Sequence, residues 1–302
     1  MAIELKILQK KVEGSISQAQ LDEEVDRLLS NPNIVAAYAE GEGNQRIFNI
    51  VVPSDNSIFD LAIQGISAQE YFKGKNVEQL IEDFVSGKSL GGLSEKYESN
   101  RDSSAIGEDS TGGFSYGRYQ IATKTGTMKS FLNFLKNTRP DMAKELNDAG
   151  GFTAARNGDP SFKGAWRSLA ANPDFPGVEH AFIRATHYDP FLRRLRGDDG
   201  DDGKIGLNLT ERSFALQNVA WSTAVQHGSA NSIFKNALAG EAIDDSVPQP
   251  TDETIIRKVY AERSKVDQYF SRSTEKVKQN VLDRFKKELP DALELLVPPV
   301  PV

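Results

Sequence analysis

The stretch that decides the fold runs from Leu93 to Met128 and reads LSEKYESNRDSSAIGEDSTGGFSYGRYQIATKTGTM. Leu93 and Tyr97 share one face at helical spacing, which predicts a short helix that ends at Glu98. The residues from Ser99 to Ala122 are rich in Gly, Ser and Asp before giving way to aromatic residues, and this predicts a β-hairpin or loop. A small β element is therefore expected near the start of the domain that contains it.

The rest of the chain after Leu93 has helical periodicity. Helices are predicted over residues 126–137, 141–149, 161–171, 177–195, 211–227, 230–239, 252–270 and 274–288, the last two with Thr251 and Ser273 as N-caps. The domain is therefore expected to be mainly helical with one small β-hairpin.

The first part of the chain has a different pattern. Leu21 and Val25 recur at helical spacing, while Phe48 and Ile50 alternate as in a strand. A helix over residues 77–85 ends at Gly87, and SGKSLGG at 86–92 predicts a hinge. We therefore predict an α+β protein with an N-terminal α+β module at 1–86, for delivery or targeting, and a catalytic domain at 87–302.

Composition excludes several classes of function. The 302 residues carry a net charge of −7, which gives no excess of Lys and Arg to neutralise a nucleic acid backbone. Cysteine is absent, so disulfides, thiol nucleophiles and thiolate metal sites are excluded, and with three histidines a zinc site is not expected. Chemistry must come from carboxylates, hydroxyls or those histidines.

The chain offers two carboxyl groups in contrasting settings. Glu98 follows Tyr97, where partial burial would raise its pKa, whereas Asp109 in a polar loop would stay ionised. One protonated and one ionised carboxyl group are what hydrolysis of a glycosidic bond requires. Taken by itself, a Glu before a loop is more often an ordinary surface residue.

A resemblance to a known family favours the catalytic interpretation of Glu98. The segments KYES, DSTGGFSYGRYQIATKTGT, ATHYDP (Ala185–Pro190) and WSTAVQHG (Trp221–Gly228) resemble those of peptidoglycan hydrolases of the lysozyme superfamily. More narrowly, the chain is similar to the chitosanase-like muramidase domains of type VI secretion effectors and phage-tail proteins. The similarity extends from about Leu93 to Leu296 and implies a lysozyme-like fold for this part.

The resemblance also implies roles for individual residues. Glu98 matches the family's catalytic acid, and Asp109 falls near its second carboxylate, although the loop between them is shorter here and Asp102 and Glu108 compete for the second role. The substrate-binding residues implied are Tyr116, Tyr119, Gln120 and His227, whose rings and amide suit sugar faces and N-acetyl groups. The two tyrosines fit the hairpin core equally well, and a His near a helix end is more often structural.

Two further motifs suggest other chemistry. GFSYG at Gly113–Gly117 satisfies G-x-S-x-G, but it lacks the apolar strand before Ser115 and the helix after it that a serine hydrolase needs. DDGDDG at Asp198–Gly203 resembles a calcium loop, but the third and twelfth positions lack the required oxygen ligands. A solvated loop is the better interpretation, with weak calcium binding left open.

The function expected from the resemblance is hydrolysis of the bond between N-acetylmuramic acid and N-acetylglucosamine, without a cofactor. A lytic transglycosylase and a non-catalytic component of a phage tail or secretion spike are the alternatives. Peptidoglycan strands, an immunity protein and a spike or tail protein are the expected partners. The N-terminus has no apolar segment typical of a signal peptide, and no apolar run is long enough to span a membrane, so delivery to the periplasm of a target cell or secretion by a non-Sec route is expected.

Overall fold

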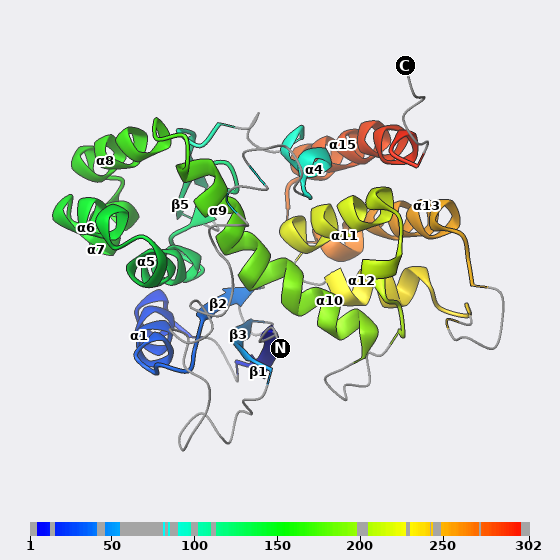
Figure 1. The fold of residues 1–302 in the computed structure, drawn as a ribbon, viewed down its shortest axis with the longest axis horizontal. Coiled ribbons are helices and arrows are strands. Elements are labelled where there is room, and N and C mark those ends of the chain that lie inside the picture. The colour runs from blue at the N-terminus through cyan, green and yellow to red at the C-terminus, as the bar shows by residue number, and fades with distance from the viewer. Residues whose placement is uncertain are drawn as a thin grey trace. The chain divides into compact units, whose positions relative to one another are not determined.

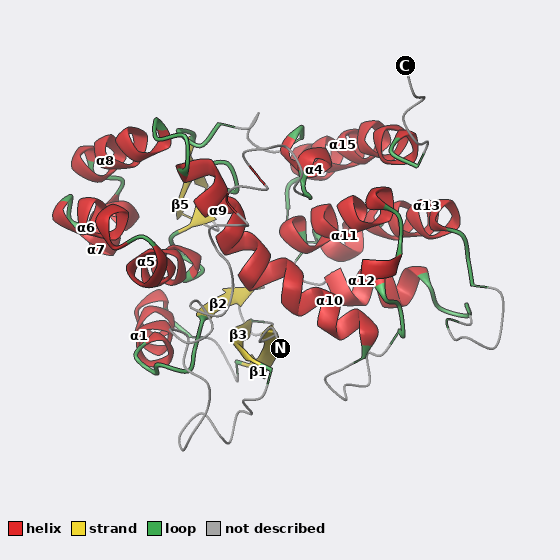
Figure 2. Ribbon diagram, in the orientation of Figure 1, coloured by secondary structure: helices red, strands yellow, loops and turns green. Residues whose placement is uncertain are grey.

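The computed structural model describes residues 5–12, 16–40, 46–54, 81, 84, 90–97, 102–109, 113–197, 205–227, 230–241, 243, 249–271 and 273–296. The fold is α+β, with short strands and many helices, as predicted (Figure 2). The chain divides into two compact units. The first unit contains Met1–Ser89 and Glu98–Pro190, and the second contains Leu90–Tyr97 and Phe191–Val302.

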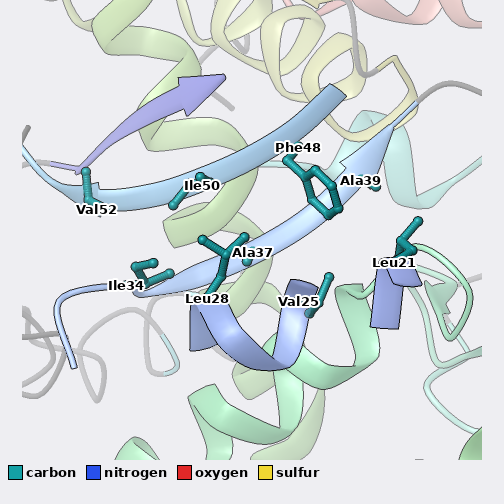
Figure 3. Close-up of a cluster of buried hydrophobic side chains, with 9 residues drawn as sticks. All are labelled: Leu21, Val25, Leu28, Ile34, Ala37, Ala39, Phe48, Ile50 and Val52. Atoms are coloured by element: carbon teal, nitrogen blue, oxygen red, sulfur yellow. The ribbon is translucent and has the colours of Figure 1, made fainter. Parts of the chain in front are cut away.

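The N-terminal part of the first unit is a small α+β module. It consists of β1 (Leu5–Lys11), α1 (Gln18–Leu29), β2 (Ala36–Glu40) and β3 (Ile47–Pro53), and the antiparallel sheet has the order β1-β3-β2. Ser17 begins α1 with a capping box that it forms with Gln20. The side chains of α1 pack on β2 and β3 in one apolar cluster, in which Val25 is fully buried (Figure 3). This confirms the α+β pattern predicted for the first residues.

This module packs against α5 (Thr127–Thr138), a helix of the same unit (Figure 1). The hydroxyl of Ser130 accepts a hydrogen bond from the Ala37 amide at 3.0 Å and donates one to the Ala37 carbonyl at 2.7 Å. The Ala39 amide donates to the Thr125 carbonyl at 2.7 Å, so β2 finds partners at the start of α5. Packing is close, because a Cβ on Gly126 would lie 2.8 Å from the Val25 side chain.

The compact units therefore do not follow the boundary predicted at residue 86. The N-terminal module shares a unit with residues 98–190 because its α1 and β2 bury their surface against α5. Of the helix predicted over 77–85, the structure describes Ile81 and Phe84, both helical, while the predicted hinge lies largely outside the described residues.

The second sheet confirms the hairpin predicted between Ser99 and Ala122. It has the order β4-β5-β6 and is antiparallel, with β4 at Ile106–Asp109, β5 at Gly113–Tyr116 and β6 at Ile121–Ala122. After α5 come α6 (Pro140–Asp148), α7 (Gly151–Asn157), α8 (Pro160–Ala170) and α9 (Phe175–Ile183). Phe131 of α5 has its ring centroid 5.6 Å from that of Trp166 of α8, at the centre of an aromatic core.

The described part of the second unit is helical. Its elements are α4 (Gly92–Glu95), most of α10 (Asp189–Arg196), the 3-10 turn η4 (Leu209–Glu211), α11 (Phe214–Gln226), α12 (Ala230–Ala237), α13 (Asp252–Arg263), α14 (Val266–Tyr269) and α15 (Glu275–Glu294). Trp221 of α11 is fully buried, and α11 contacts α4, α12, α13 and α15. A central apolar helix thus organises this unit.

The predicted helices differ from the observed ones in several places. Ser264 and Lys265 divide the helix predicted over 252–270 into α13 and α14, and α4 ends at Glu95, earlier than predicted. A π-helical turn, η3 (Arg184–Tyr188), interrupts the helix predicted over 177–195, and α7 was not predicted. Thr251 is the N-cap of α13 as predicted, but the cap of α15 is Thr274 rather than Ser273. Within the described residues, no helix combines the length and apolar character needed to cross a membrane.

Candidate functional site

The two predicted catalytic carboxylates belong to the segment that surrounds β4. Glu98 lies outside the described residues. Asp109 is the last residue of β4, and its backbone pairs with Gly113 across the hairpin. Glu108 precedes it and is exposed.

The segment that leads into Glu98 is held firmly within the second unit. Asp291 of α15 accepts hydrogen bonds from Lys96 Nζ and from the Tyr97 hydroxyl, both at 2.5 Å. Burial and the hydrogen bond to Asp291 raise the pKa of Tyr97. At the start of the segment, the Gly91 amide donates to Asn218 Oδ1 at 2.9 Å. The residues immediately before Glu98 therefore have fixed positions relative to α15.

The backbone conformation and the packing of Gly91 explain why this segment has glycine at position 91. Its φ is +103°, in the region that favours glycine, and a Cβ there would lie 2.8 Å from the indole nitrogen of Trp221. The Gly91–Gly92 pair predicted as part of a hinge instead begins α4, with Gly91 against the buried Trp221. A side chain at position 91 would push α4 away from α11.

Asp102 is a third carboxylate near β4. Its Oδ1 accepts hydrogen bonds from the Ser104 amide and the Ser104 hydroxyl, each at 2.7 Å. These hydrogen bonds lower the pKa of Asp102, which keeps the exposed carboxylate ionised. Asp102 thus closes a local turn before β4, and this structural role explains why an aspartate stands here without a catalytic function.

Gln120 is the predicted substrate-binding residue that the structure presents at the surface. Its φ is +49°, a left-handed conformation that is uncommon for a residue other than glycine. Its Oε1 accepts from the Ser115 hydroxyl at 2.7 Å, and its Nε2 donates to the Gly117 carbonyl at 2.8 Å. A Cβ on Gly107 would lie 2.7 Å from Gln120 Oε1, so the amide needs glycine at that point of β4. Local strain of this kind is concentrated at functional sites.

Tyr116 and Tyr119 are core residues instead. Tyr116 is 0% exposed, and its hydroxyl donates to the Ala155 carbonyl at 2.7 Å. Burial raises the pKa of Tyr116 to about 12. Tyr119 is 7% exposed, and its hydroxyl is hydrogen-bonded to His180 Nδ1 at 2.8 Å. Rings this deeply buried offer little surface for stacking on a sugar, which favours the hairpin-core interpretation of both tyrosines.

His227 is also part of a core, in the second unit. It is 5% exposed and its ring is 5.9 Å from that of Phe285. Arg263 Nε donates to His227 Nε2 at 3.4 Å, and burial together with Arg263 lowers the pKa of His227 well below its usual value. A buried, neutral imidazole that accepts from arginine favours a structural role for His227, and its contact with substrate stays a prediction.

Ser115 does not form a nucleophile elbow. It lies in β5, and β5 continues through a turn into β6 rather than into a helix. Its hydroxyl is committed to Gln120. No group of three or more His, Asp or Glu side chains suited to a metal occurs among the described residues. The calcium-like stretch at Asp198–Gly203 lies outside them.

Glu179 is a residue that the sequence did not single out. It lies in α9 and is 0% exposed, with its Oε1 accepting a hydrogen bond from the Arg118 amide at 3.0 Å. Burial raises the pKa of Glu179 to about 8, so it is protonated at neutral pH. One signal was present in the sequence: two adjacent ionisable residues, Glu179 and His180, inside the otherwise apolar helix FPGVEHAFI.

Two comparisons with known proteins cover this part of the chain. The family described as type VI secretion system spike protein VgrG3-like, C-terminal, matches residues 90–289. The type VI secretion system spike protein VgrG3 of Vibrio cholerae serotype O1 is 31% identical over 172 residues. This match covers 55% of the chain and about 15% of the length of that spike protein. The matched family begins beyond the N-terminal α+β module.

Proposed function

The chain belongs to the family of VgrG3-like C-terminal domains of type VI secretion spike proteins, and from this we propose that it is a peptidoglycan glycan-strand hydrolase delivered by type VI secretion. The observation that carries the proposal is the turn Gly117–Gln120, which presents the amide of Gln120 at the surface beside β4, the strand that ends in Asp109. A side-chain amide both donates and accepts hydrogen bonds, which suits recognition of the N-acetyl groups of a glycan strand.

The proposed mechanism uses two carboxyl groups. Glu98 donates its proton to the leaving glycosidic oxygen, which lets the bond between N-acetylmuramic acid and N-acetylglucosamine break. Asp109, as the base, takes a proton from water as the water attacks the anomeric carbon from the opposite face, and the product has inverted configuration. Lys96 and Tyr97 precede Glu98 in the chain and are anchored to Asp291. This anchoring is proposed to contribute to catalysis by the acid.

The substrate-binding role belongs to Gln120 in this proposal. Its side chain is oriented by Ser115 and by the Gly117 carbonyl, so its position is set before substrate arrives. The partner that brings the protein to its substrate is proposed to be a spike protein, in line with the name of the V. cholerae relative.

The test is the clearing of a peptidoglycan suspension by purified protein. The wild-type protein should clear it, Glu98→Gln should lose activity by at least about a hundredfold, and Asp109→Asn should be similarly impaired. Glu294→Gln on the exposed end of α15 is the matched control and should behave as wild type. If Asp109→Asn is harmless, water attack through Asp109 is wrong and a lytic transglycosylase is the better assignment. If the wild-type protein does not clear the suspension, the enzymatic proposal fails.

A further inference from the structure

Two consecutive residues of α9, Glu179 and His180, hold two consecutive residues of the turn that follows β5. Glu179 Oε1 accepts from the Arg118 amide at 3.0 Å, and His180 Nδ1 is hydrogen-bonded to the Tyr119 hydroxyl at 2.8 Å. The next residue of the turn is Gln120. We propose that Glu179 and His180 are positioning residues that fix the Gly117–Gln120 turn so that Gln120 faces the glycan strand. This inference rests on the proposed function.

The contact between α9 and the turn is unusually close. Gly117 has φ +76°, and a Cβ there would lie 1.8 Å from Glu179 Oε1 and 2.8 Å from the Trp166 ring. The Arg118 residue is itself 9% exposed, so its amide has little water to replace a lost acceptor. The glycine of the turn and the glutamate of α9 therefore fit each other, and neither position tolerates a change of shape.

Glu179 also reaches the other end of the hairpin. The side chain of Ser103, just before β4, lies beside the Glu179 carboxyl group, and the Ser103 carbonyl accepts from Trp166 Nε1 at 2.8 Å. The segment that enters β4 and the turn that leaves β5 thus meet at one buried side chain. A displacement of Glu179 would move both, and with them the surface on which Gln120 lies.

His180 has the same buried character. It is 1% exposed, and its ring centroid is 4.8 Å from that of Phe84. Burial, with Arg184 and Arg118 nearby, lowers the pKa of His180 to about 3, so the ring is neutral and hydrogen-bonds the Tyr119 hydroxyl without carrying charge. The charged groups that face this pair are Arg118, Arg184 and Asp102.

A double-mutant cycle tests whether Glu179 acts through Gln120. Glu179→Met keeps most of the volume but removes the acceptor, whereas Glu179→Gln keeps an acceptor. We expect Gln120→Ala to raise KM for soluble peptidoglycan fragments about tenfold, Glu179→Met to do the same, and the double variant to be no worse than the worse single variant. Glu179→Gln should stay within about twofold of wild type.

The control variant is Asp22→Asn, which breaks an ion pair with Arg156 elsewhere in the same unit. Its effect should add to that of Gln120→Ala, because the two sites do not share the turn. If the effects of Glu179→Met and Gln120→Ala are also independent, the KM of the double variant rises by the product of the two single effects. That result would refute the positioning role.

Amide hydrogen exchange separates this proposal from the proposed function, because it needs no substrate. Glu179→Met should speed exchange of the Arg118 amide by at least about tenfold, and Glu179→Gln should not. If Glu179→Met does not fold, His180→Phe carries the test, because it removes the hydrogen bond to the Tyr119 hydroxyl. It should raise KM, and the double variant with Gln120→Ala should be no worse than the worse single variant. Independent effects of His180→Phe and Gln120→Ala on KM would then overturn the proposal.

Discussion

Replacing Glu179 by Gln should stabilise the first unit, and the gain should grow with pH. The pKa of this carboxyl is about 8 in the folded protein against an ordinary value of 4.5, because it is fully buried. Between these two values the folded state holds one proton more than the unfolded state. The free energy of unfolding of the wild type therefore falls as pH rises from 4.5 to 8. Gln does not titrate, so the variant escapes this loss.

The size of the effect follows from proton linkage. One pKa unit corresponds to about 1.4 kcal/mol. The free energy of unfolding of the variant minus that of the wild type should therefore increase by about 2.5 kcal/mol between pH 5 and pH 7. Above pH 8 the difference should level off, because the carboxyl is then ionised in both states. A contribution of the new amide that does not depend on pH changes the stability difference by the same amount at every pH and leaves its pH dependence unchanged.

The assay is denaturant unfolding followed by tryptophan fluorescence. The chain has two tryptophans, with Trp166 in the first unit and Trp221 in the second. A Trp221→Phe background leaves Trp166 as the reporter for the unit that contains Glu179, and both compared proteins carry it. The buried histidines are the same in both proteins, so their titration cancels. A stability difference that is independent of pH from 5 to 7 would refute the protonated, buried state of Glu179.

Three further predictions concern other parts of the chain. Burial lowers the pKa of His187 to about 4, so the neutral ring stabilises the fold above pH 6.5 and this stabilisation is lost as pH falls. The wild type should therefore lose about 2 kcal/mol more of its free energy of unfolding between pH 8 and pH 5 than His187→Phe does, as measured by denaturant unfolding at both pH values. An equal loss in the two proteins would contradict this. Asp291→Asn should lower kcat about tenfold and lower the pKa of Tyr97, which a spectrophotometric titration measures. Unfolding of the first unit should not change. Full activity would show that the anchoring of Lys96 and Tyr97 does not affect the catalytic acid. A chain that begins at Ser86 should aggregate or melt at least about 10 °C lower than the full chain, because α5 loses the residues that pack on it. A monomeric fragment with the melting temperature of the full chain would contradict this and would support a catalytic domain at 87–302 that folds independently.

Most helices could be predicted because their apolar residues recur at helical spacing. The elements α5 and α8 were placed within one residue of their observed ends. The helix α7 was missed because Gly150 and Gly151 indicate a break, whereas the structure uses Gly150 in a left-handed conformation to begin a new helix directly after α6. The π-helical turn η3 leaves the apolar pattern intact and gives no sequence signal.

The packing of the N-terminal module on α5 could not be predicted, because it depends on contacts between distant parts of the chain. Ser130 and Ala37 are hydrogen-bonded across 93 positions, and Lys129 reaches the Asp22 carbonyl across 107 positions. Composition and local periodicity contain no information about such pairs. The glycine-rich stretch before Leu93 was interpreted as a hinge, but Gly91 is needed for close packing against Trp221.

The candidate site could be predicted in part. The motif around Gln120 was recognised from its residues, and the structure places this side chain at the surface in a left-handed conformation. Sequence could not decide between groove and core for Tyr116 and Tyr119, because aromatic residues in a short strand or turn suit both. Glu179 was missed because its partner, Arg118, lies 61 residues earlier in the chain.

The central claim is that this chain hydrolyses glycan strands with Glu98 as the acid, and mass spectrometry of products formed in oxygen-18 water tests it most directly. Hydrolysis predicts reducing N-acetylmuramic acid ends that carry one labelled oxygen, formed by the wild-type protein and absent with Glu98→Gln. Unlabelled anhydro ends would show a transglycosylase and contradict the role of Asp109 as base. Labelled ends formed equally well by Glu98→Gln would contradict the assignment of the acid, and no released fragments would contradict the enzymatic function itself.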